Sequence, residues 1–250
     1  MTAFFIQIFE YSMASPIITR FSAAALAYSL HAGVQQKAAA LLADSLSAVV
    51  PAATTGWAVD VGAGVGLSTM LFALRWPALR WLALDRAEAT LHHNPRPAVV
   101  ADAAALPIAK VELLTANCVL QWLDNPLDVF QGWRSHSRVV AATLFLEGTC
   151  AEWYQALAKA GLPPPHRFLP RDQVEAFCHK NTITLRTASF PMPYPSASAF
   201  VRAVHRLGAG SPAVADYPRL TPRQMRAALH HLESAGHTTY SYEVACLLAV

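Results

Sequence analysis

A glycine-rich segment constrains the fold of this chain more than any other feature. The segment Val59-Asp60-Val61-Gly62-Ala63-Gly64-Val65-Gly66 follows an apolar run and precedes a helical pattern. Glycines are needed where a chain turns tightly from strand to helix and its backbone approaches a ligand closely, and the next helix directs its amide donors at that ligand. A dinucleotide fingerprint would have glycine at position 67, which is Leu67 here. The segment therefore predicts a site for a ligand with adenosine but no phosphate, and a turn that binds nothing is the alternative.

Apolar runs alternate with helical patterns along the first part of the chain. Runs typical of buried strands occur at Trp57–Val61, Arg80–Leu84, Ala98–Ala101, Glu112–Ala116 and Val139–Phe145. Amphipathic patterns predict helices over 34–49 and 67–74. Strands that alternate with helices form βαβ units, so we expect an α/β protein with a mostly parallel sheet.

The last third of the chain is rich in proline and arginine. Its patterns predict helices over 171–179, 197–206 and 222–235, and strands over 182–190 and 239–249. This order predicts a helical insertion at about 191–236, between the last two strands. Residues 1–20 are expected to be an N-terminal extension of a single domain, 21–250, because the apolar start contains Glu10 and lacks the positive region of a secretory signal.

The composition argues against several classes of protein. Hydrophobic residues make up 54% and charged residues 14%, which favours a large core over disorder. No apolar run reaches the roughly 18–20 residues that a membrane span needs, and a net charge of +3 is too small to indicate a nucleic-acid partner. The four cysteines lack metal-site spacing, so we expect reduced thiols in a cytoplasmic protein without a metal: Cys118, Cys150, Cys178 and Cys246.

Two acidic residues stand where the second and third predicted strands end. Asp85 lies 19 residues after Gly66, and a carboxylate there can accept both ribose hydroxyls of a nucleoside. Asp102, followed by Ala103, is placed to hold an adenine amino group. The alternatives are a strand-end aspartate that caps the next helix and, for Asp102, a helix N-cap. With the glycine segment, these residues occupy successive strand ends, where open α/β sheets bind ligands.

The motifs at these positions resemble those of class I S-adenosylmethionine-dependent methyltransferases. The matching segments are VDVGAGVG, LALD, VVADAAALPI and LLTANCVLQW. Further segments resemble the malonyl-[acyl-carrier-protein] O-methyltransferases of the biotin pathway: FSAAALAYSLHAGVQQKAAALL (21–42), NCVLQWLDNP (117–126), RFLPRDQVEAF (167–177), LGAG (207–210), LTPRQM (220–225) and TTYSYEVACLLAV (238–250). The chain departs from that pattern at Val111-Glu112, where Phe-Asp is usual, and at 134–138, where a Pro-Gly turn is usual; the segment between Asp85 and Asp102 is also short.

The resemblance implies a Rossmann-like fold with seven strands, the last antiparallel, and a methyl transfer of the EC 2.1.1 class. The donor is S-adenosylmethionine, which becomes S-adenosylhomocysteine. The acceptor is the free carboxylate of a malonyl group on acyl carrier protein or CoA. Because a carboxylic acid has a pKa of about 4, no general base is required and no catalytic dyad is expected. Proximity, orientation and partial desolvation would supply the rate.

The resemblance also implies roles for individual residues. The expected cofactor-binding residues are Asp60, Gly62, Ala63, Gly64, Asp85, Asp102, Ala103 and Asn117. The expected acceptor-pocket residues are Tyr28, Gln121 and Trp122, with His31 as a further lid residue. An acidic carrier protein would dock on a basic face, for which the candidates are Arg202, Arg206, Arg219, Arg223 and Arg226.

Other interpretations stay open at this point. Tyr28, His31 and Trp122 suit ordinary structural roles, and the arginines suit a solvated face. A methyltransferase acting on a small free carboxylate, such as a polycarboxylate, is one alternative function. A homologue that binds S-adenosylmethionine without turnover is another, and an RNA methyltransferase is a weaker one, since the net charge is small.

Overall fold

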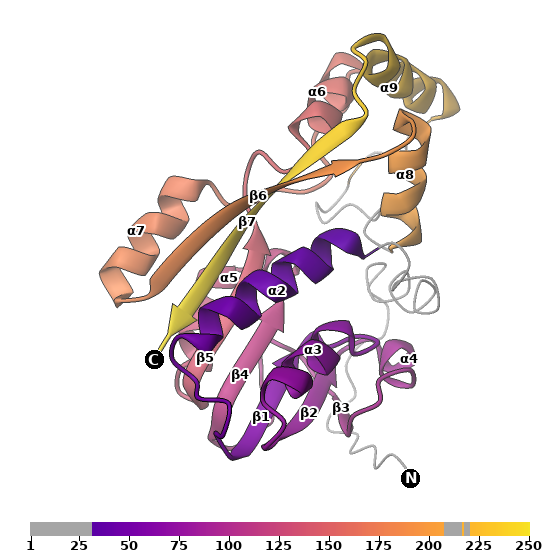
Figure 1. Ribbon diagram of the computed structural model, residues 1–250. Coiled ribbons are helices and arrows are strands. Elements are labelled where there is room, and N and C mark those ends of the chain that lie inside the picture. Colours follow the sequence, from indigo (N-terminus) through magenta and orange to yellow (C-terminus); the bar gives the residue numbers. More distant parts are fainter. Residues whose placement is uncertain (1–31, 208–216, 218–220) are drawn as a thin grey trace.

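A seven-stranded sheet forms the centre of the protein (Figure 1). The computed structural model describes residues 32–207, 217 and 221–250. The strands are β1 (Gly56–Val61), β2 (Leu79–Asp85), β3 (Ala98–Val100), β4 (Val111–Asn117), β5 (Ser137–Phe145), β6 (Thr184–Pro193) and β7 (Thr239–Ala249). Their order is β3-β2-β1-β4-β5-β7-β6. Strands β1 to β5 pair in parallel, and β7 runs antiparallel to β5 and β6. The chain order reverses between β1 and β4, and α/β sheets bind ligands at the carboxyl ends of such strands.

Helices cover both faces of this sheet. The helices of one face are α2 (Gly33–Ser47) and α3 (Leu67–Arg75), and those of the other are α5 (Pro126–Trp133) and α7 (Arg171–Asn181). Adjacent strand residues point to opposite faces: Ala58 packs in the cluster of Leu46 and Phe72, whereas Val59 packs in that of Phe130. Short helices, α4 (Glu88–Leu91) and the 3-10 helix η1 (Leu120–Trp122), follow soon after the carboxyl ends of β2 and β4.

Three helices gather at the far end of the long β6–β7 pair (Figure 1). They are α6 (Ala151–Lys159), α8 (Ala197–Arg206) and α9 (Pro222–Ser234). Their core is aromatic: the ring of Phe200 stacks on Tyr240 at 3.8 Å between centroids, with 7° between the planes. Helix α9 begins at a capping box formed by Thr221 and Gln224, which satisfies amide donors at the helix start. These helices therefore form an apolar cluster beside the carboxyl end of β5.

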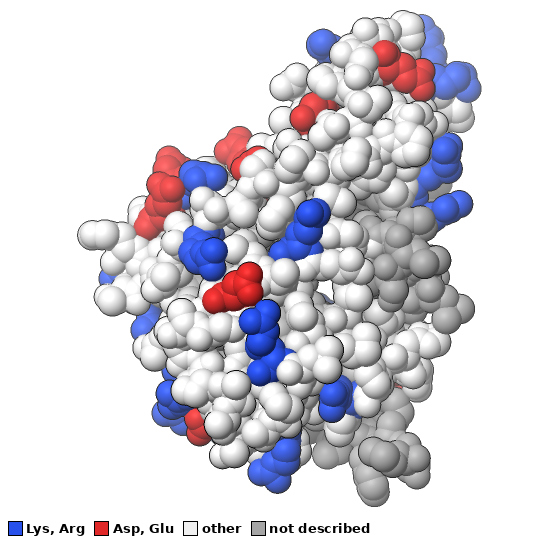
Figure 2. All heavy atoms as spheres, viewed as in Figure 1, with Lys and Arg blue, Asp and Glu red and all other residues white. Residues whose placement is uncertain are grey.

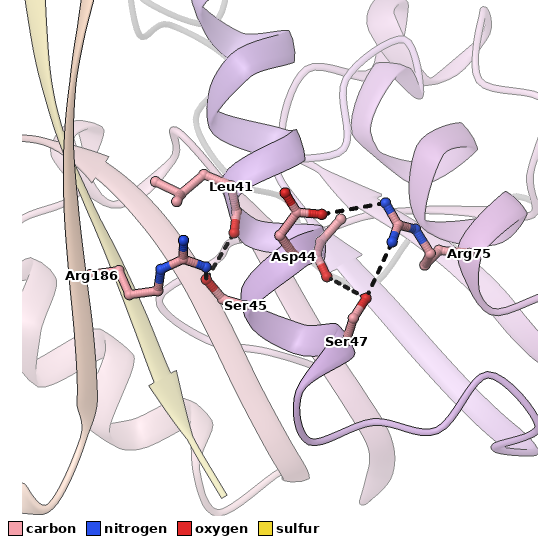
Figure 3. Close-up of polar contacts among 7 residues, drawn as sticks. Leu41, Asp44, Ser45, Ser47, Arg75 and Arg186 are labelled. Carbon is pink, nitrogen blue, oxygen red and sulfur yellow. Dashed lines mark hydrogen bonds and ion pairs between the residues drawn. The ribbon is translucent and has the colours of Figure 1, made fainter.

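Helix α2 is fastened on both sides by two serines in its last turn (Figure 3). Buried Ser45 donates to the Leu41 carbonyl at 2.8 Å and accepts from Arg186 of β6 at 3.1 Å. Exposed Ser47 accepts from Arg75 of α3 at 3.5 Å, and the same arginine pairs with Asp44 at 3.4 Å. The helix is thereby tied to both the α3 side and the β6 edge of the sheet.

The predicted fold class is confirmed, including the antiparallel last strand. Some boundaries were wrong. The first helix ends at Ser47, β3 ends at Val100, and β6 runs through Pro191 to Pro193 because an edge strand tolerates residues without an N–H. Helix α6 was not predicted; it starts after Cys150, which is not a usual N-cap residue and whose side chain forms no cap hydrogen bond.

The described residues hold neither a candidate membrane-spanning helix nor a candidate metal site. Among the described residues, no helix is long and apolar enough to cross a membrane. The same residues contain no group of three or more His, Cys, Asp or Glu side chains arranged to hold a metal ion.

Candidate active site

The turn after β1 can be built only from glycine at two positions. Gly62 has φ +66°, and a Cβ there would overlap Cγ2 of Val119, which follows β4. Gly66 has φ +89°, and a Cβ there would lie 3.0 Å from Oδ1 of Asn94. A side chain at either position would be strained by the positive φ. It would also be crowded, because the turn lies directly against the segments that follow β4 and α4. The approach of this backbone to a ligand stays a prediction.

Two polar side chains form hydrogen bonds with the backbone of Gly64. Its N–H donates to Oδ2 of Asp85 at 2.9 Å, and its carbonyl accepts from Nδ2 of Asn94 at 3.1 Å. Oδ1 of Asp85 accepts from the Ala87 N–H at 2.8 Å. Burial raises the pKa of Asp85, while the hydrogen bonds from Ala87 and Gly64 act in the opposite direction. The carboxylate also accepts a backbone hydrogen bond from Arg86. A carboxylate has about four acceptor sites, so Asp85 retains capacity for a ligand hydroxyl.

Asp60 lies beneath this turn. Its carboxylate accepts from Thr69 of α3 at 2.6 Å and from Thr115 of β4 at 2.9 Å, and the residue is 1% exposed. Burial, opposed by these hydrogen bonds, raises its pKa from 3.8 to about 7. Both oxygens are thus engaged by hydroxyl groups, and the geometry favours a role in joining β1, α3 and β4 over direct contact with a cofactor.

Asp102 and Ala103 lie at the end of the third strand, as predicted, but no helix follows them. Oδ1 of Asp102 accepts from the Ala104 N–H at 2.9 Å, and Oδ2 pairs with Arg86 at 3.5 Å. The carbonyl of Ala103 accepts from Trp133 Nε1 at 2.8 Å. The N-cap alternative for Asp102 is therefore wrong, because a turn and not a helix follows the residue.

Asn117, the last residue of β4, is a hydrogen-bonding hub. Its Nδ2 donates to the backbone carbonyl of Gln35 and to Ser68 Oγ, both at 2.9 Å, and its Oδ1 accepts from Thr143 at 2.7 Å. The side chain thus joins α2, α3, β4 and β5. Because these interactions engage both side-chain atoms, any contact of Asn117 with a cofactor falls to its backbone.

An aromatic pocket lies beside the hub, between η1, β5 and the α6–α8–α9 cluster. It has a volume of about 130 Å³. Its described lining includes Gln35, Trp122, Phe145, Trp153, His166 and Tyr242. The ring of Trp122 packs edge-on against His166 at 5.3 Å. None of the described residues that line the pocket is Lys, Arg, Asp or Glu, so the walls offer no formal charge to a ligand apart from a protonated histidine.

Two glutamines near the pocket have an unsatisfied oxygen. Gln121 donates from Nε2 to the Cys118 carbonyl at 2.6 Å, and its Oε1 is buried without a partner among the described residues. Oε1 of Gln35 is in the same condition. Leaving such an atom unpaired costs about 1–3 kcal/mol. Gln121, unlike Trp122, is not among the described lining residues of the pocket.

The thiols nearest the site are poor nucleophiles. Burial raises the pKa of Cys118 to about 12, and burial likewise raises that of Cys150 to about 12. Both groups are therefore protonated at neutral pH. This agrees with a site that works by positioning rather than by covalent catalysis.

Most of the predicted docking arginines are exposed on α8 and α9, and Figure 2 shows basic side chains along that edge. Arg202, Arg206, Arg223 and Arg226 are exposed, and no described residue forms an ion pair with any of them. Helices α8 and α9 pack against each other. Arg219, Tyr28 and His31 lie outside the described residues.

Sequence reasoning missed several residues of the site. Asn94 and Gln35 were not singled out, although Asn-Pro after a short helix at 94–95 is a turn signal that could have indicated the first. The aromatic residues of α6 were missed together with the helix.

Comparison with known proteins shows which proteins the chain is similar to. A scan against family models finds no match. The malonyl-[acyl-carrier protein] O-methyltransferase of Xylella fastidiosa is 30% identical over 209 residues, which cover 76% of this chain and 70% of the relative. The enzyme of that name from Neorickettsia risticii is 24% identical, covering 79% and 83%. A trans-aconitate 2-methyltransferase of Azoarcus is 39% identical over 90 residues, but these cover only 33% of this chain and 35% of the relative.

Solved structures share the fold at low sequence identity. The YcgJ protein of Bacillus subtilis superposes with a TM-score of 0.55 at 10% identity, covering 82% of this chain and 96% of that one. A methyltransferase of Bacillus halodurans gives 0.52 at 12% identity, with the same coverage. The glycine turn, the strand-end Asp85 and these relatives agree: the chain belongs to the malonyl-[acyl-carrier protein] O-methyltransferase family of class I S-adenosylmethionine-dependent enzymes.

Proposed function

We propose that this enzyme transfers a methyl group from S-adenosylmethionine to the free carboxylate of a malonyl group carried as a thioester on acyl carrier protein. The product would be the malonyl methyl ester that primes pimelate and biotin synthesis, and the reaction would take place in the cytoplasm, where thiols stay reduced. The observation that carries the proposal is the aromatic pocket beside Asn117, which has no described Lys or Arg in its walls.

The described residues fit the cofactor. The glycine turn leaves no room for side chains at Gly62 and Gly66, and Asp85 has acceptor capacity for ribose hydroxyls. Asp102 and Ala103 flank the position proposed for adenine. When bound, S-adenosylmethionine supplies an electrophilic methyl group on a sulfonium. The carboxyl ends of β1 and β4 would hold that methyl group toward the pocket.

The chain's own contribution is orientation and exclusion of water. The acceptor carboxylate is already ionised, so its oxygen attacks the methyl carbon without a general base. S-adenosylmethionine, held by the glycine turn and Asp85, would supply the methyl carbon to this oxygen and would keep the electron pair of the broken carbon–sulfur bond as a neutral thioether. An apolar pocket strips water from the carboxylate, which raises its reactivity.

The uncharged described lining of the pocket supports one of the two candidate substrates. A free polycarboxylate would bring two or more negative charges into an aromatic pocket, where burial of unpaired charge is costly. A malonyl thioester brings one carboxylate and leaves its carrier outside. We further propose that the α8–α9 segment is a recognition insertion, with Arg202, Arg206, Arg223 and Arg226 facing the acidic carrier.

Mass spectrometry of the reaction products tests the proposal. Malonyl-carrier protein, malonyl-CoA and trans-aconitate are incubated separately with the enzyme and S-adenosylmethionine. We expect the malonyl-carrier protein to gain the mass of one methylene. Methylation of trans-aconitate alone would overturn the proposed substrate, and calorimetric binding of S-adenosylhomocysteine without any turnover would instead indicate a binding protein.

A further inference from the structure

Gln35 occupies the junction between the hub and the aromatic pocket. Its backbone carbonyl accepts from Asn117 Nδ2 at 2.9 Å. Its side chain is 9% exposed and lines the pocket together with Trp122 and Tyr242. Its Oε1 is buried and has no hydrogen-bond partner in the part of the chain that the structure describes. A buried polar atom usually has a hydrogen-bond partner, so an unpaired amide that lines a pocket is a candidate to hydrogen-bond a ligand.

The position of Gln35 is fixed by its neighbours along α2. Val34 and Ala38 pack into the aromatic cluster with Cys118 and Phe145. Because α2 is also fastened at its other end by Ser45, the helix cannot carry the amide away from the pocket without breaking these contacts. The carboxamide is thus held close to the carboxyl end of β4, where the methyl group would point.

We propose that the carboxamide of Gln35 positions the acceptor, by donating a hydrogen bond to the carboxylate of the thioester-borne acyl group in the aromatic pocket. This inference rests on the proposed function. A half-turn about the terminal bond exchanges the oxygen and nitrogen of the amide, so the group can present an N–H to the carboxylate.

A neutral donor suits this reaction better than a charged one. An Arg or Lys would hold a carboxylate more tightly, but it would also stabilise the negative charge that must attack the methyl group. An amide orients the same oxygen atoms while leaving the charge largely uncompensated, and only interactions that favour the transition state raise the rate. The described walls, which contain no Lys, Arg, Asp or Glu, would remove water from the carboxylate, and the Gln35 amide would set its direction.

Gln35→Leu and Gln35→Glu test the assignment, with Gln36→Leu as the matched control because Gln36 is exposed on the same helix. For Gln35→Leu we expect kcat/KM for malonyl-carrier protein to fall about 10- to 100-fold, as for loss of a hydrogen bond to a charged group. The dissociation constant of S-adenosylhomocysteine should stay within about twofold. Gln36→Leu should match the wild type in both measurements.

The pH profile of Gln35→Glu separates positioning from a structural role. Burial should raise the pKa of the new carboxyl group above its ordinary value of about 4.3. The protonated acid can donate to the acceptor, whereas the ionised form repels it. Activity of Gln35→Glu should therefore decline as pH rises through the raised pKa of this carboxyl group, while Gln35→Leu keeps the pH profile of the wild type.

The outcomes are distinguishable. If the wild type methylates the malonyl carrier and Gln35→Leu does so equally well, the assignment of Gln35 is overturned and the proposed function stands. If Gln35→Leu loses activity together with S-adenosylhomocysteine binding, its role is structural and the assignment is again overturned. If the wild type methylates no malonyl thioester, the proposed function fails, and this assignment fails with it.

Discussion

The backbone N–H of Gly64 donates to Oδ2 of Asp85 at 2.9 Å across 21 residues of sequence. This bond ties the turn after β1 to the end of β2, so the Asp85 carboxylate supports the turn in the absence of a ligand. In the proposed cofactor site, the shape of the turn and the affinity for the cofactor would therefore both depend on the Asp85 side chain.

Replacing Asp85 with alanine should weaken cofactor binding. The substitution removes the expected acceptor of the ribose hydroxyls and one support of Gly64. We expect the dissociation constant of S-adenosylhomocysteine, measured by calorimetry, to rise about 10- to 100-fold. Asp124→Ala, an exposed acid, is the control and should bind normally. Equal affinities for the two variants would remove Asp85 from the cofactor site.

Alanine at two glycines should have opposite effects. At Gly62 the positive φ and the overlap with Val119 should destabilise the fold by about 2–5 kcal/mol. At Gly132, inside α5, a Cβ would meet nothing within 4 Å, so alanine should stabilise by about 0.5–1 kcal/mol. Urea unfolding of both variants checks this. A Gly62→Ala protein as stable as the wild type would contradict the close packing of Gly62 against Val119.

Asp60 should make stability depend on pH. Its pKa is about 7 in the folded protein against an ordinary 3.8, so unfolding between these values releases a proton. This contribution to stability is present at low pH and is lost as pH rises through 7. Asp60→Asn lacks the titration, so its stability relative to the wild type should rise by roughly 2–3 kcal/mol from pH 5 to pH 8. Denaturant unfolding at both pH values measures the change, and an unchanged difference between the two proteins would contradict it.

The two serines of α2 offer a matched pair. Both donate to a carbonyl four residues earlier and accept from an arginine, but Ser45 is 5% exposed whereas Ser47 is exposed (Figure 3). Ser45→Ala leaves Arg186 and the Cys246 thiol without their acceptor. We expect a loss of about 1–3 kcal/mol for Ser45→Ala and less than about 0.5 for Ser47→Ala in thermal unfolding. Similar losses would show that burial is not the deciding difference.

Charge reversal on α8 should weaken recognition of the carrier. In the double variant Arg202→Glu, Arg206→Glu, the KM for malonyl-carrier protein should rise at least about tenfold at low salt, and less at high salt because ions screen surface charge. The variant Lys110→Glu, Lys180→Glu changes the net charge equally on other exposed residues and should leave KM nearly unchanged. Steady-state kinetics at two salt concentrations measure both. A KM that rises equally in both double variants would reflect net charge and not a docking surface.

Features built from residues that are close in the sequence could be predicted, whereas features built from distant residues could not. The glycine turn is contiguous, so its position and its strand–helix context were predicted correctly. The hydrogen-bond partners of Asp60 were not predicted, because Thr69 and Thr115 lie 9 and 55 residues away. The pocket combines η1, β5, α6, α8 and α9, and its key contact joins Gln35 to Asn117 across 82 residues. Periodicity within a window cannot register such contacts.

The place of β7 inside the sheet has a consequence for how the protein is made. Its residues pair with β5 on one side and β6 on the other, and among the described strands β6 pairs with β7 alone. While the ribosome is still adding residues 239–249, β5 ends in an open edge and β6 has no partner. Strands β1 to β5 can pair during translation, but β6 can join the sheet only after β7 has been made. In that interval the nascent chain exposes unpaired strand edges, which favour aggregation.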